Sequence, residues 1–444
     1  MRHSWTRYLP EGLRHSLAGQ GELRKVAGNA AWQFADQLAR MAIGLAVGIW
    51  LARYLGPEQY GLLSYALAFV ALFGAFAAMG LDDIIVRDIV REPAGRDRIL
   101  GSACLLRLCG GALAFAAAVG TIMLLRPGDP LSHALVALVA CGSVFQAFSV
   151  IEFWFHAQVQ ARSVVLAKCC AFLLCSLAKV VLILAAAPLV AFAWVALAEV
   201  VLGVIGLAMA YQLTGHRLRA WRGTLATAGA LFRDGWPLML SGMVIMVYLR
   251  IDQVMLGELA GDGEVGVYSV AVRLAEVWYF IPTALYWTLF PGIVAARSES
   301  EELFYERLQK FYNLVVLAGY TVAIPVTLLS HWLVPLLFGA EYARGGPMLA
   351  VLIWANLFTG LEMARSGFLT AMNWTRLYLA TVTLGCLLNI ALNFWLIPLY
   401  GGMGAVAASL AAYWLAAHGA CFLFAPLRRT GAMLTRALLW PRVW

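Results

Sequence analysis

The sequence predicts an all-α polytopic membrane protein, with about twelve transmembrane helices in two six-helix lobes related by a parallel pseudo-two-fold repeat. Of the 444 residues, 62% are hydrophobic and only 13% are charged, whereas a soluble domain carries about 25% charged residues. Apolar runs longer than about 18 residues recur along the whole chain, and each can span a bilayer. A repeat between the two halves of the chain predicts the two lobes.

The twelve apolar runs define the expected spans in chain order. They cover residues 28–53, 61–85, 101–125, 132–156, 163–186 and 189–211 in the first half, and 234–257, 266–296, 311–334, 347–371, 376–397 and 402–424 in the second. Gly56-Pro57 ends the first run and Gly61 begins the second, which predicts a hairpin between them. Pro282 and Pro291 fall inside the run 266–296 and predict a kinked helix there.

A short motif occurs once in each half. Aligning "LGPEQYGLLSYALA" (55–68) with "AGDGEVGVYSVAVR" (260–273) pairs Gly56 with Gly261 and Gly61 with Gly266. Each copy joins the first two helices of a six-helix set, and an even number of helices keeps both sets in the same orientation. The predicted organisation is an N-terminal segment 1–27, an N-lobe 28–212, a linker 213–233, a C-lobe 234–424 and a tail 425–444.

Lysine and arginine gather in alternate loops. Basic clusters lie at 87–98 and 217–233 and in the tail, whereas the loop 258–264 is acidic. The positive-inside rule then predicts that both termini lie in the cytoplasm. The net charge of +8 therefore reflects topology. Anionic membrane lipid is the expected partner of these clusters, and nucleic acid is not.

Soluble chemistry has little room in this chain. The outer loops are short, and the sequence contains no Walker A loop, HExxH, Gly-x-Ser-x-Gly or aspartate-rich metal motif. The eight cysteines lie inside predicted spans without metal-ligand spacing. We therefore expect no catalytic residue, no metal site and no cofactor, and a transporter is favoured over a polymerase or ligase of lipid-linked glycans.

Three segments resemble bacterial oligosaccharide flippases, the Wzx-type polysaccharide exporters whose superfamily also contains MATE drug exporters and the lipid II flippase. They are "WLARYLGPEQYGLLSYALAFVALFGAFAAMGLDDIIVRDI" (50–89), "IDQVMLGELAGDGEVGVYSVAVRL" (251–274) and "NFWLIPLYGGMGAVAASLAAY" (393–413). The resemblance implies a flippase that moves an undecaprenyl-pyrophosphate-linked oligosaccharide, such as an O-antigen precursor, to the periplasmic leaflet by alternating access. Other membrane proteins of polysaccharide assembly are implied as partners. The motifs mark the scaffold and leave the sugar open.

Charged residues inside the spans are the candidate functional residues, because an ionisable group at membrane depth costs at least about 2.5–3.5 kcal/mol. The basic ones are Arg40, Arg107, Lys168, Lys179, Arg250, Arg273 and Arg365, and the acidic ones are Asp36, Glu152, Glu199, Asp252, Glu276 and Glu362. Together they predict a polar cavity between the lobes.

A pyrophosphate suits arginine, whose planar fork donates two hydrogen bonds to phosphate oxygens. The predicted substrate-binding residues are Arg40, Arg250, Arg273, Arg107, Lys179 and Arg365, with the first three favoured by their depth. Asp36, Asp252, Glu276, Glu199 and Glu362 are candidates for binding a coupling ion, H⁺ or Na⁺, or for charge pairing.

Internal pairing is the alternative interpretation of the same charges. Asp36 with Arg40 has i,i+4 spacing, and Arg273 with Glu276 and Glu362 with Arg365 have i,i+3 spacing, so that each pair can neutralise itself on one helix face. An exporter of small cations of the MATE type remains a second hypothesis. Its site would be more acidic than this set of charges.

Overall fold

The computed structural model describes the backbone of residues 11–442 and the side chains of residues 36–160 and 162–442. Over this part of the chain it is helical and without strands, and eleven segments are long and apolar enough to cross a membrane. One of them, Asp36–Leu72, holds two helices joined at Gly56, whose φ of 69° and ψ of 171° are not helical. The predicted all-α membrane fold is confirmed.

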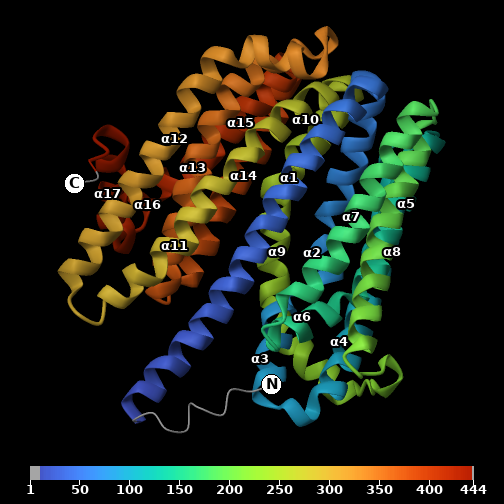
Figure 1. The fold of residues 1–444 in the computed structure, drawn as a ribbon. Helices are drawn as coiled ribbons and strands as arrows, with labels where there is room; N and C mark the ends of the chain where they lie inside the picture. The colour runs from blue at the N-terminus through green and yellow to red at the C-terminus, as the bar shows by residue number, and fades with distance from the viewer. Residues whose placement is uncertain (1–10, 443–444) are drawn as a thin grey trace.

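The first half of the chain forms the N-lobe, which lies on the right in Figure 1. Its helices are α1 (Glu11–Leu72), α2 (Gly74–Ala78), α3 (Asp82–Arg91), α4 (Arg96–Leu125), α5 (Pro130–Phe145), α6 (Val150–Ala157), α7 (Ala161–Leu184) and α8 (Leu189–Leu213). Residues 1–10 of the predicted N-terminal segment lie outside the described residues, and its remainder belongs to α1.

The second half forms the C-lobe, on the left in Figure 1. Its helices are α9 (Leu225–Ala260), α10 (Asp262–Glu276), α11 (Phe280–Ala296), α12 (Glu301–Phe338), α13 (Gly345–Ala371), α14 (Thr375–Tyr400), α15 (Gly402–Trp414), α16 (Ala420–Leu423) and α17 (Arg428–Leu439). A π-helical segment, Leu415–Gly419, joins α15 to α16. In the predicted tail, residues 443 and 444 lie outside the described residues.

Polar caps fix where several helices begin. The side chain of Thr224 accepts a hydrogen bond from the Thr227 amide at the start of α9, and Ser300 does the same for Leu303 at the start of α12. Such caps satisfy amides that have no partner inside the helix. They show why long apolar helices begin immediately after short polar loops.

The repeat seen in the sequence is also present in the backbone. Gly56 and Gly261 adopt nearly the same conformation, with φ of 69° and 90° and ψ of 171° and 166°, a region that is open essentially to glycine. A Cβ on Gly61 would lie 1.8 Å from the carbonyl oxygen of Asp262, and a Cβ on Gly266 would lie 2.1 Å from that of Pro57. These contacts are reciprocal in the alignment, so the two copies of the motif meet across the pseudo-two-fold axis.

Two expected spans differ in detail. The predicted span 61–85 is interrupted, because α1 ends at Leu72 and the chain passes through α2 and a left-handed Met79-Gly80 turn before α3 begins. The predicted kink in 266–296 is confirmed. A 3₁₀ turn, Val277–Tyr279, separates α10 from α11 just before Pro282, as expected from the clash between a proline ring and the carbonyl four residues earlier.

Apart from α9, which packs against α2 and α4 of the N-lobe, the helices of the C-lobe meet the N-lobe at one end of the molecule and diverge from it toward the other (Figure 1). At the meeting end, called here the acidic end, Arg126 from the end of α4 binds Glu258 at 2.8 Å and Asp262 at 2.9 Å. The Arg126 guanidinium also lies 4.0 Å from the centre of the buried Tyr65 ring. The opposite end, called here the basic end, carries the arginine clusters, where Arg87 pairs with Asp234 at 2.8 Å.

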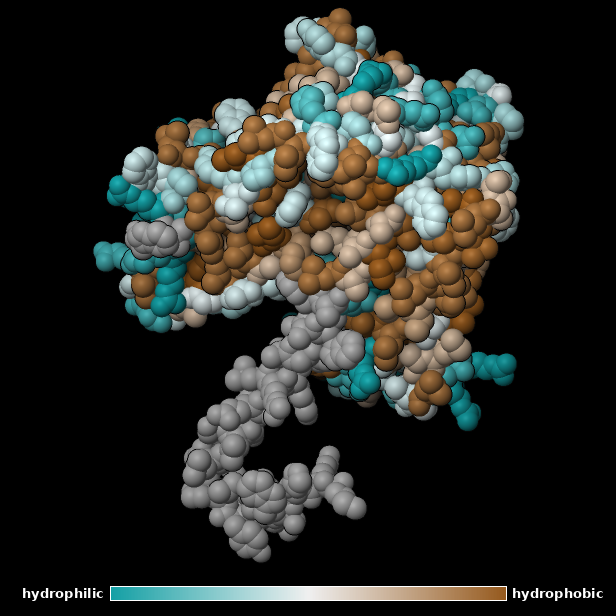
Figure 2. Space-filling view, turned by 45° about the horizontal axis from the view of Figure 1, so that its top comes forward, coloured by the Kyte–Doolittle hydropathy of each residue, from teal (hydrophilic) through white to brown (hydrophobic). Residues whose placement is uncertain are grey.

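Apolar side chains cover the flanks of the bundle, with hydrophilic residues gathered toward its ends (Figure 2). Exposed examples are Leu328 and Trp332 on α12 and Leu174 and Leu177 on α7. A soluble protein rarely exposes so continuous an apolar surface. The surface therefore matches a lipid environment and leaves the interior as the place for polar function.

Candidate substrate cavity

Three neighbouring cavities run from inside the N-lobe to the interface between the lobes. The N-lobe chamber, about 730 Å³, is lined only by residues of the N-lobe. The neck, about 240 Å³, lies between α1, α7 and α8 and reaches Arg273 of α10. The interlobe chamber, about 390 Å³, is lined by α1, α9 and α10. Lys179 lines both the N-lobe chamber and the neck, and Arg273 lines both the neck and the interlobe chamber.

Each basic side chain of the N-lobe chamber has a carboxylate partner. Arg40 binds Asp36 at 2.8 Å, Lys168 binds Glu152 at 2.6 Å and Lys179 binds Glu199 at 3.0 Å. The nearly buried Arg107 binds Asp82, and it also donates to the Ser149 hydroxyl at 2.8 Å. The predicted i,i+4 pair of Asp36 and Arg40 is thus present.

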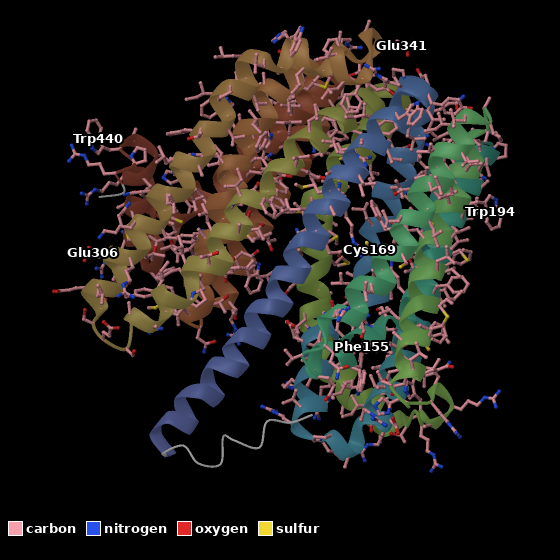
Figure 3. All side chains as sticks on the ribbon, in the orientation of Figure 1. Phe155, Cys169, Trp194, Glu306, Glu341 and Trp440 are labelled. Atoms are coloured by element: carbon pink, nitrogen blue, oxygen red, sulfur yellow. The ribbon has the colours of Figure 1, made fainter. Side chains whose placement is uncertain are left out.

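The four pairs come from α1, α3, α4, α6, α7 and α8. Figure 3 labels Cys169, the chain neighbour of Lys168, midway between the two ends of the bundle, and Phe155 of α6 closer to the basic end. Sequence analysis did not identify Asp82 as a site residue, because α3 was read as the end of an apolar span. Ser149 was also missed, since a lone serine inside an apolar run carries no signal of its own.

Arg273 has a different environment from the other cavity cations. Its guanidinium donates to the Gly44 carbonyl at 2.6 Å and lies 3.4 Å from the Tyr60 hydroxyl, both on α1. No ion pair joins it to a carboxylate among the described side chains. A Cβ on Gly48 would lie 2.3 Å from Arg273 Cζ, so glycine at this position makes room for the guanidinium between the lobes.

The predicted pairing of Arg273 with Glu276 is absent. Glu276 instead pairs with Arg250 of the neighbouring α9 at 3.4 Å. Both of these residues line the interlobe chamber, and both are partly exposed there. Arg250 has no partner at helical spacing on α9, as expected. Its partner, Glu276, lies on the neighbouring helix α10.

Asp252 lies inside the C-lobe and lines none of these three chambers, but the small cavity that it does line shares Gln253, Val272 and Glu276 with the interlobe chamber. Its carboxylate is 2% exposed and accepts hydrogen bonds from the Tyr268 hydroxyl at 3.0 Å, the Ser409 hydroxyl at 2.5 Å and the Asn393 amide at 2.6 Å. The amide oxygen of Asn393 is buried without a partner. Sequence analysis named Asp252 as a candidate for ion coupling or charge pairing, but it did not identify Asn389 and Asn393, which lie one helical turn apart within the apolar α14.

Glu362 and Arg365 are likewise buried within the C-lobe and line none of the three chambers. The fully buried guanidinium of Arg365 donates to the Thr381 hydroxyl at 2.8 Å and to Cys421 Sγ at 3.2 Å. The expected ion pair between Glu362 and Arg365 is not formed among the described side chains. Of the predicted substrate-binding residues, Arg40, Arg107, Lys179, Arg250 and Arg273 line the chambers.

Comparison with known proteins identifies the family. The family profile described as "Polysaccharide biosynthesis protein" matches residues 26–296, which is more than half of the chain. The chain belongs to the polysaccharide biosynthesis protein family. A second profile, MatE, matches residues 237–395.

One curated relative of this family member is the probable flippase AglR of Haloferax volcanii, 26% identical over 218 residues. The alignment covers 48% of this chain and 44% of that flippase, so it spans less than half of the relative's length. Each protein is therefore compared with only part of the other.

Solved structures support the fold over nearly the full length. An inward-facing MATE multidrug transporter of the MOP superfamily matches with a TM-score of 0.70 at 18% identity, over 89% of this chain and 96% of that chain. The lipid II flippase MurJ, in an inward closed conformation, matches with a TM-score of 0.70 at 14% identity, over 92% and 91% of the two chains. At these identities the similarity establishes the two-lobed fold.

Proposed function

We propose that this protein is a flippase that moves an undecaprenyl-pyrophosphate-linked oligosaccharide from the cytoplasmic to the periplasmic leaflet without changing it chemically. The observation that carries the proposal is the continuity of the three cavities inside an apolar helical bundle. They lead from a large chamber with charged residues in its wall to an arginine that has no carboxylate partner among the described side chains. Membership of the polysaccharide biosynthesis family supports a glycan as the substrate, and the name of the AglR relative supports flippase activity.

The proposed route assigns the pyrophosphate to Arg273. A phosphate oxygen can replace the Gly44 carbonyl and the Tyr60 hydroxyl as the partner of the Arg273 guanidinium. A hydrogen bond between two charged groups is stronger, since charge-assisted hydrogen bonds are about twice as strong as neutral ones. Arg250 and Lys179 flank Arg273 in the adjoining chambers. The sugars would then occupy the N-lobe chamber, and the polyprenyl chain would stay in the surrounding lipid.

Alternating access requires the lobes to separate at the acidic end. There Arg126 would have to release Glu258 and Asp262, and the close contact of Gly61 with Gly266 would have to open. All of these contacts are confined to one end of the bundle, so that a rocking motion of one lobe against the other breaks them together.

We propose that the protein lies in a bacterial inner membrane. Its basic end and both termini would then face the cytoplasm. A cysteine introduced at Glu58 or Asp262 should react with an impermeant thiol reagent added to intact spheroplasts, because both residues lie at the acidic end. A cysteine at Arg96 or Arg222 should react only after the membrane is permeabilised. The reverse labelling pattern would overturn the orientation.

The lipids that co-purify with the protein test the substrate class. We expect native mass spectrometry of the protein in nanodiscs to show a bound polyprenyl-pyrophosphate glycan, which is reduced when Arg273 is replaced by alanine. A small organic cation bound in its place would favour an exporter of the MATE type, to which the MatE match over the C-lobe points, and would count against the flippase.

A further inference from the structure

The side chains that line the N-lobe chamber indicate which class of sugar it can hold. We propose that it is the glycan compartment of the flippase and that it selects a neutral oligosaccharide over one that carries acidic sugars. This inference rests on the proposed function and extends it from a lipid-linked glycan in general to a chemical class of glycan.

The first support is charge balance. The four basic side chains of the chamber each hold a carboxylate from another position: Arg40 holds Asp36, Arg107 holds Asp82, Lys168 holds Glu152 and Lys179 holds Glu199. The walls therefore present no surplus of positive charge. A glycan with a negative charge on each repeat would find no free cation here, although Arg273 remains available for the pyrophosphate outside this chamber.

The second support comes from the exposed fractions of the two side chains in the ion pairs. The Asp82 side chain is 58% exposed while Arg107 is 5% exposed, and Glu199 is 31% exposed while Lys179 is 22% exposed. In these two pairs the carboxylate is the more exposed member, whereas in the other two the base is: Lys168 is 40% exposed against 17% for Glu152, and Arg40 is 25% exposed against 14% for Asp36. An acidic sugar in the chamber would meet the carboxylates of Asp82 and Glu199 at short range, and like charges repel each other.

The third support is that paired charges suit sugar hydroxyls. A hydroxyl both donates and accepts hydrogen bonds, so it can donate to a carboxylate such as Glu152 while it accepts from the ammonium of Lys168, and the pair need not break. Leu67, Val204 and Leu207 add apolar wall for the C–H faces of sugar rings. The volume of about 730 Å³ lies within the range of about 300–1,000 Å³ of ligand pockets and fits a short oligosaccharide.

Two synthetic lipids test this with the wild-type protein in liposomes. One is undecaprenyl-pyrophosphate bearing a trisaccharide of glucose, and the other is the same lipid with one glucose replaced by glucuronic acid. The neutral lipid should be translocated at least about tenfold faster, which corresponds to about 1.4 kcal/mol of discrimination. Equal rates, or faster movement of the acidic lipid, would overturn the neutral-glycan inference and leave the flippase standing. Movement of neither lipid would overturn the proposed function.

The double variant Glu152→Gln/Glu199→Gln tests whether the chamber carboxylates cause the difference in rate between the two lipids. Removing both negative charges leaves Lys168 and Lys179 unpaired in the chamber, so the acidic lipid should gain at least about tenfold relative to the neutral one. The matched control is Glu306→Gln on α12, which removes a carboxylate paired with Lys310 at 2.8 Å on the surface of the C-lobe, and it should leave the ratio unchanged. An unchanged ratio in the double variant would contradict a role for the chamber carboxylates.

Discussion

Replacing Arg273 by alanine should reduce translocation of a lipid-linked glycan in liposomes by at least about 30-fold, since removing one partner of a buried charged contact costs about 2 kcal/mol or more. Arg273 is singled out because it lines both the neck and the interlobe chamber and, among the described residues, is hydrogen-bonded to Gly44 and Tyr60 without a carboxylate partner. Arg273→Lys should recover part of the rate, because lysine keeps the charge but loses the bidentate fork.

A matched control separates this role from the general loss of an arginine. Arg307 on α12 also donates to a backbone carbonyl, that of Gly292 at 2.9 Å, but it lies on the exposed surface. Arg307→Ala should translocate at the wild-type rate. Wild-type translocation by Arg273→Ala, at the same amount of reconstituted protein, would show that the pyrophosphate is bound elsewhere.

Replacing Asp252 by asparagine should abolish the response of translocation to an ion gradient. We propose that Asp252 binds the coupling ion, H⁺ or Na⁺, because it is a buried carboxylate among hydroxyl and amide groups, next to an Asn393 oxygen that lacks a partner. An ionisable residue at membrane depth is in most cases functional. Asparagine has nearly the same shape, so the fold should be retained while the charge is lost.

The measurement is the ratio of translocation rates with and without an imposed gradient of protons or of sodium. The ratio should exceed one in the wild type for one of the two ions and fall to about one in Asp252→Asn, because an ion can shift the conformational equilibrium only through a difference in binding. Asp234→Asn is the control on the same helix, where the carboxylate pairs with Arg87 at the exposed basic end. An undiminished ratio in Asp252→Asn would assign coupling to another group.

The fold was predictable because its main determinants are local. Apolar runs specify spans, and the glycines of the two motif copies specify the reversals at Gly56 and Gly261. Both of these positions adopt the non-helical conformation that only glycine tolerates well. The break in the span 61–85 does have local signals, namely Gly74, Gly80 and the pair Asp82-Asp83, but sequence analysis did not use them.

The site was predictable only where partners share a helix. Asp36 and Arg40 pair as their spacing indicates. Glu276, however, pairs with Arg250 on α9 and not with Arg273 on its own helix. Lys168 pairs with Glu152, and Arg107 pairs with Asp82, in each case on another helix. Spacing within a helix carries no information about these partners, which depend on how the helices pack. The sequence placed the cavity between the lobes, whereas its largest chamber is lined by the N-lobe alone.

Our main proposal is that these connected chambers carry a lipid-linked glycan across the membrane and leave it chemically intact. Its most direct test is reconstitution of the purified protein in liposomes with a polyprenyl-pyrophosphate oligosaccharide in one leaflet. Accessibility to an added glycosidase reports transfer to the other leaflet, and mass spectrometry of the unreacted lipid reports its integrity. We expect protein-dependent transfer with unchanged mass. No transfer above protein-free liposomes, or a lipid with a lengthened or removed glycan, would contradict it.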